Sequence, residues 1–177
     1  MFEAIPIHEN DLSAVGCYYH IGILSDSKKT MSFYASVGTG GSLYKEATNV
    51  YQNILPIKEC SYTLDEIIQQ EGLPLPDFIK LDVQGAELDV LNGASNSLRH
   101  AKALLLECPI YPYNVGAPSM EDYIEFLLQR GFYPARCAED HEIGGVFGQV
   151  DIIFLLRDIL EKVDPEFDGF FKVGPSL

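Results

Sequence analysis

The chain has 177 residues, 47% of them hydrophobic and 21% charged, and a formal net charge of −14. This composition excludes an intrinsically disordered chain and predicts a single domain, residues 1–177. The acidic balance argues against nucleic acids and anionic membranes, which are held through Lys and Arg. No apolar run approaches the ~20 residues of a membrane span, and no secretory signal pattern opens the chain.

The first third of the chain predicts short elements. A strand tail over residues 2–6, which ends at Pro6, is followed by a helix over 7–15 and by a strand pair, joined by a polar turn, over 17–36. The alternation of apolar and polar residues at 31–36 is typical of a half-buried strand. A further short strand is expected at 57–60.

From residue 57 onward, the patterns of strands and helices alternate. Thr63 and Glu66 have the spacing of a capping box, so we expect a helix that begins there and ends near Gly72. Strands are expected at 78–81, 103–106, 132–136 and 150–156, with helices after 87 and after Ser119. This order predicts an α/β sandwich with a mainly parallel sheet. The last two strands should be antiparallel because only a loop joins them.

Three acids, Glu3, Asp82 and Glu107, directly follow strand-like runs. Ligands of open parallel sheets bind beyond the carboxyl ends of the strands, so these acids are expected on one rim. Glu3 suits hydrogen bonds to ribose hydroxyls. Asp82 lies near a helix N-terminus, where Gly85 allows close backbone approach. The competing interpretation is structural: the acids are solvated, or Asp82 accepts backbone donors of the following helix.

The four cysteines and four histidines are scattered along the chain. No spacing typical of zinc ligands occurs, so we expect no metal site. Well-separated cysteines predict buried thiols in a reducing compartment, and hence a cytoplasmic location.

One run carries a family resemblance. Residues 80–94, Lys-Leu-Asp-Val-Gln-Gly-Ala-Glu-Leu-Asp-Val-Leu-Asn-Gly-Ala, have the form K-x-D-x-x-G-x-E followed by an apolar helix that ends L-x-G-A. This run resembles the signature of the FkbM-type methyltransferases. Residues 2–6, 41–43, 63–65, 106–107 and 131–132 resemble further segments of that family.

The resemblance implies a Rossmann-like class I methyltransferase fold that uses S-adenosylmethionine. The acceptor would be a hydroxyl of a small molecule or sugar. Glu3 would hold the cofactor ribose, and Ser25 or Asp26 would face the adenine. Asp82 and Gly85 would lie near the methionine end.

Methyl transfer to a hydroxyl also requires alignment of the two reacting atoms and removal of the hydroxyl proton. Asp82 and Glu107 are the two candidates for the general base. The family's first strand, first helix and glycine-rich loop have no counterpart here. We therefore expect an N-terminally truncated fold whose exposed sheet edges favour a homodimer.

Two other functions stay open. A methyltransferase-fold remnant that no longer binds cofactor would act as an interaction module. Alternatively, the run Gly38-Thr-Gly-Gly41, with a helix over 43–53 and a strand over 54–59, would form a dinucleotide-binding unit of an oxidoreductase. Pro56 inside that strand and the glycine spacing argue against this reading.

Overall fold

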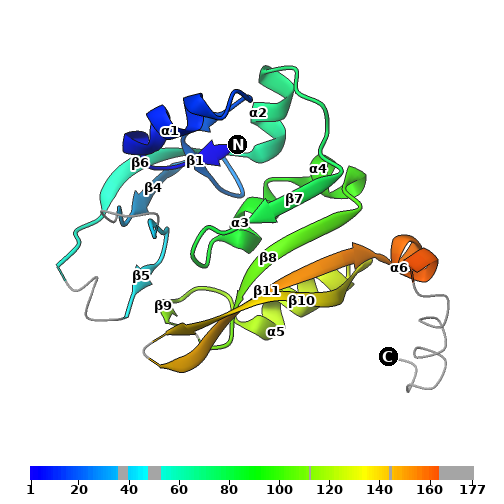
Figure 1. Cartoon of the computed structure of the whole chain (residues 1–177). Coiled ribbons are helices and arrows are strands. Elements are labelled where there is room, and N and C mark those ends of the chain that lie inside the picture. The colour runs from blue at the N-terminus through cyan, green and yellow to red at the C-terminus, as the bar shows by residue number, and fades with distance from the viewer. Residues whose placement is uncertain (36–39, 48–52, 112, 144, 164–177) are drawn as a thin grey trace.

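The computed structural model describes residues 1–35, 40–47, 53–111, 113–143 and 145–163 (Figure 1). Its elements are β1 (Phe2–Glu3), η1 (Pro6–His8), α1 (Glu9–Ala14), β2 (His20–Ile21), β3 (Ile23–Leu24), β4 (Thr30–Phe33), β5 (Lys45–Glu46), β6 (Ile57–Tyr62), α2 (Leu64–Gln70), β7 (Phe78–Leu81), α3 (Glu87–Asn92), α4 (Ser95–His100), β8 (Ala103–Pro109), β9 (Asn114–Val115), α5 (Met120–Leu128), β10 (Phe132–Ile143), β11 (Val146–Leu156) and α6 (Arg157–Val163).

The main sheet has the strand order β10-β11-β8-β7. Leu104, Leu106 and Phe154 are completely buried on one face of it and share a core with Tyr123 and Leu127 of α5. The near-continuous apolar run predicted to be a central strand is β8, which lies between β7 and β11. This sheet therefore fixes the positions of the residues that follow its strands.

Local signals in the sequence set the ends of the helices. The Thr63 side chain accepts a hydrogen bond from the backbone N–H of Glu66 at 3.1 Å, so the predicted cap of α2 is confirmed. Ser119 and Asp122 form a complete capping box at the start of α5. The side chains of both caps satisfy amides that have no partner inside the helix.

An α/β fold is confirmed, but the predicted mainly parallel sheet is not. In the main sheet only β7 and β8 are parallel, while β8–β11 and β10–β11 are antiparallel. The predicted antiparallel arrangement of the last two strands is confirmed, because they form one long hairpin. This hairpin extends the strands well beyond the predicted ranges, with register shifts along β10.

The predicted strand pair over 17–36 is wrong in its pairing. β3 and β4 flank opposite sides of β6, parallel on one side and antiparallel on the other. The Ser61 hydroxyl on β6 donates to the backbone carbonyls of Ser27 (2.8 Å) and Lys29 (3.0 Å). These bonds hold the polar turn around β6 and keep β3 and β4 apart.

In Figure 1 the first group of strands lies beside β7, and a groove of about 580 Å³ is lined by residues of both. Phe2, Leu24 and Phe78 contribute to its apolar wall, and Asp82 and Val83 lie along its lining. The outer edge of β7 pairs with no strand among the described residues. The exposed edge behind the homodimer prediction is thus present, and the dimer itself stays a prediction.

The prediction of four buried thiols is wrong for three of them. Cys108 is buried, whereas Cys17, Cys60 and Cys137 are exposed, and no disulfide joins them. Cys17 follows α1, and Cys60 and Cys137 lie on exposed stretches of β6 and β10. The wide spacing of the cysteines along the chain therefore did not indicate which of them are buried. Within the described ranges, no helix combines the length and apolar character needed to cross a membrane.

Candidate active site at the rim of the main sheet

The loop that follows β7 turns sharply before α3. Gly85 has a φ of 97°, and a Cβ there would lie 3.0 Å from the Cβ of Ala117 and 3.3 Å from Nδ2 of Asn114. Gln84 also adopts a positive φ of 53°, which is uncommon for a residue with a side chain. The glycine of the signature is thus explained by conformation and by close packing.

The buried side chain of Glu87 holds this loop in place through hydrogen bonds. It is completely buried; one oxygen accepts a hydrogen bond from the Val83 backbone at 2.9 Å and the other accepts one from the Tyr123 hydroxyl. Burial raises the pKa of Glu87, although these hydrogen bonds act in the opposite direction. The backbone N–H of Val83 in this loop therefore donates to Glu87. The partners of Asp82 are the side chains of Gln84 and Lys80.

The Gln84 amide joins the two predicted catalytic acids. Its Nε2 donates to Oδ1 of Asp82 at 3.1 Å and to Oε1 of Glu107 at 3.0 Å. Its backbone carbonyl accepts hydrogen bonds from Ser42 (2.7 Å) and Asn114 (2.8 Å). These contacts bring the ends of β7 and β8, the 41–43 segment and β9 to one rim.

Glu107 lies in a crowded, partly enclosed position. Burial and, to a smaller extent, the nearby carboxylates of Asp82, Glu87 and Asp151 raise its pKa to about 8, while Lys80 acts in the opposite direction. Asp82 is more open: 46% of its side chain is exposed, and it forms an ion pair with Lys80 at 3.5 Å. The two acids on this rim therefore have different environments.

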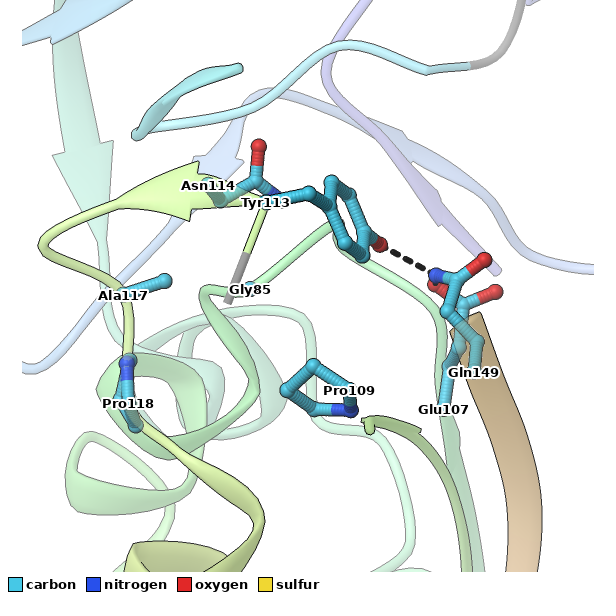
Figure 2. Close-up of a pocket in the computed structure, with 8 residues that line it drawn as sticks. All are labelled: Gly85, Glu107, Pro109, Tyr113, Asn114, Ala117, Pro118 and Gln149. Carbon is cyan, nitrogen blue, oxygen red and sulfur yellow. Dashed lines mark hydrogen bonds between the residues drawn. The ribbon is translucent and has the colours of Figure 1, made fainter. Parts of the chain in front are cut away.

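Figure 2 shows the enclosed part of the rim. Tyr113 points across it toward Gln149, whose Nε2 donates to both the Tyr113 hydroxyl and Oε1 of Glu107. Gly85 and Pro109 are among the residues that line a cavity of about 10 Å³ here. A void of that size holds roughly one water centre. The enclosed cavity is therefore too small for a substrate.

Glu3 lies apart from these two acids. Its Oε1 accepts a hydrogen bond from the backbone N–H of Ile5 at 2.8 Å. A cavity of about 70 Å³ connects Glu3 to Val83 and Ala86 of the loop after β7. Glu3 therefore faces the same loop as the rim, without a hydrogen bond to Asp82 or Glu107.

Ser25 and Asp26 are engaged in local structure. Ser25 is completely buried, and its hydroxyl donates to Asp26 at 3.1 Å. Asp26 also accepts a hydrogen bond from Lys29 at 2.6 Å, which is the largest cause of its lowered pKa. These contacts favour a role for both residues in shaping the turn after β3.

Sequence reasoning missed three polar residues of the rim, namely Gln84, Tyr113 and Gln149. Gln84 lies inside the recognised signature, at a position where the pattern specifies no residue type, and the other two are distant in sequence from it. Neutral amides carry no spacing rule like that of metal ligands or capping boxes. Only the register of β8 and β11 brings Gln149 to the rim, because it pairs with Pro109.

The described residues contradict the alternative prediction of a dinucleotide-binding unit at residues 38–59. Gly38 and Thr39 lie outside the described residues. A Cβ on Gly41 would lie 2.5 Å from the Phe33 ring, so this glycine packs against the small core. Residues 45–46, predicted to be helical in that unit, form β5 and pair with β9.

Comparisons with known proteins identify a family and one relative. Residues 3–134, more than half of the chain, match the family described as the methyltransferase FkbM domain. The hexuronic acid methyltransferase AglP of Haloferax volcanii is 32% identical over 84 residues, which is 48% of this chain and 33% of that protein. The matched region thus spans about a third of that relative's length. No solved structure matches the chain significantly.

Proposed function

The chain belongs to the FkbM methyltransferase family, and we propose that it transfers a methyl group from S-adenosylmethionine to a hydroxyl of a small molecule or sugar. The similarity to a hexuronic acid methyltransferase supports a sugar as the acceptor class. The observation that carries the proposal is the Gln84 amide, which holds the carboxylates of Asp82 and Glu107 side by side on the rim.

The described residues fit a nucleoside cofactor. Glu3 offers a carboxylate in the cavity that it shares with Val83 and Ala86, which suits ribose hydroxyls. The adjoining groove of about 580 Å³ has an apolar wall and reaches Asp82. That volume lies within the roughly 300–1,000 Å³ range of small-molecule sites. When bound, S-adenosylmethionine supplies a methyl group activated by its sulfonium.

We assign removal of the acceptor proton to Asp82. Its carboxylate is nearly half exposed beside the groove, so an acceptor hydroxyl can reach it. Glu107 is less accessible because Oε1 is covered by the amides of Gln84 and Gln149. The Gln84 amide fixes the orientation of the Asp82 carboxylate, and such fixed geometry is what proton transfer requires.

The two remaining functions of the sequence analysis differ in their support. The 45–46 strand argues against the oxidoreductase. An interaction module without cofactor binding is distinguished from the enzyme by cofactor titration. An interaction module would not need the exposed Asp82 carboxylate to be oriented by Gln84, a residue whose positive φ is energetically costly.

The substitution Asp82→Asn tests the proposal. Asparagine keeps the hydrogen bond from Gln84 but cannot accept the proton, so methyl transfer should slow by about a hundredfold or more. S-adenosylmethionine affinity should change less than about threefold. The measurement is transfer of a radiolabelled methyl group to a panel of neutral hexoses and hexuronic acids, together with calorimetric titration of the cofactor.

Asp77→Asn is the matched control. Asp77 precedes the other end of β7, where it pairs with Lys102 at 2.6 Å, so its loss should leave transfer unchanged. Equal losses of rate and cofactor affinity in Asp82→Asn would contradict the assigned role. Absence of methyl transfer by the unmodified chain to every hydroxyl acceptor would contradict the proposed function.

A further inference from the structure

Three strands bring an imidazole and two carboxylates together beside the rim. Glu107 on β8 lies directly opposite Asp151 on β11, and His141 on β10 lies opposite Gln149, two residues before Asp151. One potential ligand atom from each of these three side chains lies within 4.8 Å of the others. The sequence analysis expected no metal site because these residues are far apart along the chain.

The bonding of this cluster is incomplete. Oδ1 of Asp151 is buried and accepts no hydrogen bond from any described residue, although Nε2 of His141 lies 3.5 Å away. Both amide donors to Glu107 approach Oε1, and no described residue donates to its other oxygen. The cluster therefore presents unused acceptor atoms at one point.

We propose that Glu107, His141 and Asp151 bind one divalent metal cation. Carboxylate oxygens and an imidazole nitrogen suit a cation such as Mn²⁺ or Zn²⁺, which bind both kinds of atom. Bonds of about 2.1 Å place neighbouring ligand atoms roughly 3 Å apart, close to the observed 3.5 Å between His141 and Asp151. The third potential ligand atom, on Glu107, lies within 4.8 Å of the other two.

Carboxylates surround the cluster, and such surroundings suit a cation. Asp82 and Glu87 are among the carboxylates that act on Glu107, and Lys80 is the positive group acting on it. Lys80 is already paired with Asp82. A divalent cation would satisfy the buried Oδ1 of Asp151, which has no hydrogen-bond donor among the described residues.

Three protein ligands leave coordination positions open, as in catalytic metal sites. If the proposed function holds, one of these open positions would bind the oxygen of the acceptor hydroxyl beside Asp82 and lower the pKa of that hydroxyl; this step rests on the proposed function. It would also let an acidic rim receive a negatively charged sugar. Metal binding itself requires neither cofactor nor acceptor, so it can be measured separately.

The test is titration of the full chain with Mn²⁺ alone, followed by calorimetry and by electron paramagnetic resonance of the free ion. One site per chain is expected. His141→Ala and the nearly isosteric Asp151→Asn should each weaken Mn²⁺ affinity by about tenfold or more. Mn²⁺ should also raise the melting temperature of the unmodified chain and not that of the two variants.

His100→Ala is the matched control. Nε2 of His100 lies 3.6 Å from Asp77 on the exposed surface, a similar pair, but it is not part of the three-residue cluster. This variant should bind Mn²⁺ like the unmodified chain. Circular dichroism spectra that match the unmodified chain establish that the two ligand variants are folded.

Two results would overturn the site: no Mn²⁺ binding up to about 1 mM, or binding that folded His141→Ala and Asp151→Asn leave unchanged. Either result would leave the proposed methyl transfer intact, because the titration contains no cofactor or acceptor. Conversely, normal Mn²⁺ binding by a chain that transfers no methyl group would contradict the function and not the site.

Discussion

Gly93, the residue that caps α3, packs closely against the backbone that follows β3. A Cβ at this position would lie 2.1 Å from the backbone oxygen of Ser25 and 3.1 Å from Cβ of Thr63. Contacts under 3.0 Å with backbone atoms require the backbone to move. The glycine of the L-x-G-A segment therefore has a packing reason: it lets α3 dock against the turn after β3.

We predict that Gly93→Ala destabilises the fold by about 1–3 kcal/mol, the usual range for overpacking a close contact. The measurement is urea unfolding followed by circular dichroism. Gly22→Ala is the comparison variant and should cost less, because the nearest atom to its added Cβ, Nε2 of His20 at 2.8 Å, belongs to a side chain and not to the backbone. Equal stability of Gly93→Ala and the unmodified chain would contradict the assigned contact.

The loop after β7 and helix α3 behave as one element because Glu87 ties them to α5. Its two oxygens bond the Val83 backbone and the Tyr123 hydroxyl, so removal of the carboxyl leaves two polar groups without a partner. An unsatisfied buried donor costs about 1–3 kcal/mol. Glu87 is thus a positioning residue for Asp82, which lies at the start of the same loop.

The raised pKa of Glu87 predicts a pH dependence of stability. The folded chain holds this proton more tightly than the unfolded chain does, so the free energy of unfolding should fall as pH rises above the usual carboxyl pKa toward the raised value. The Asp82 carboxylate contributes to the raised pKa of Glu87. The pKa of Glu107 is raised as well, so Glu107 adds to the same pH dependence. A variant is needed to isolate the contribution of Glu87.

Glu87→Gln should reduce this slope, because glutamine keeps an acceptor for Val83 and a donor for Tyr123 without titrating. Glu87→Ala should lose stability at every pH. The measurement is the urea midpoint of each variant across the range from the usual carboxyl pKa to mild alkali. A slope in Glu87→Gln equal to that of the unmodified chain would contradict the account.

The elements were predictable where a local rule fixes them. The caps at Thr63 and Ser119 and the strand before Asp82 follow from residue types at short spacing. The site depends on register, which local patterns do not encode: a shift of one residue would turn Asp151 away from Glu107. The roles of Gln149 and His141 were unpredictable for this reason.

The whole molecule consists of a main sheet and an earlier strand group, with a groove between them. Family membership was readable from a signature that spans one loop and one helix. The mixed sheets could not be predicted from the sequence. Strands of two residues, such as β1 and β3, are too short to show an alternation of apolar and polar residues from which their partners could be inferred. The proposed function at this scale requires a nucleoside cofactor to bind in the groove that reaches Asp82 and in the adjoining cavity that Glu3 lines.

Calorimetric titration of the chain with S-adenosylmethionine tests this central claim most directly. We predict binding by the unmodified chain, a loss of about tenfold or more in Glu3→Ala, and no change in Glu59→Ala, which removes an exposed acid from β6. Absence of both heat and thermal stabilisation with the unmodified chain, or equal affinity of Glu3→Ala, would contradict the account.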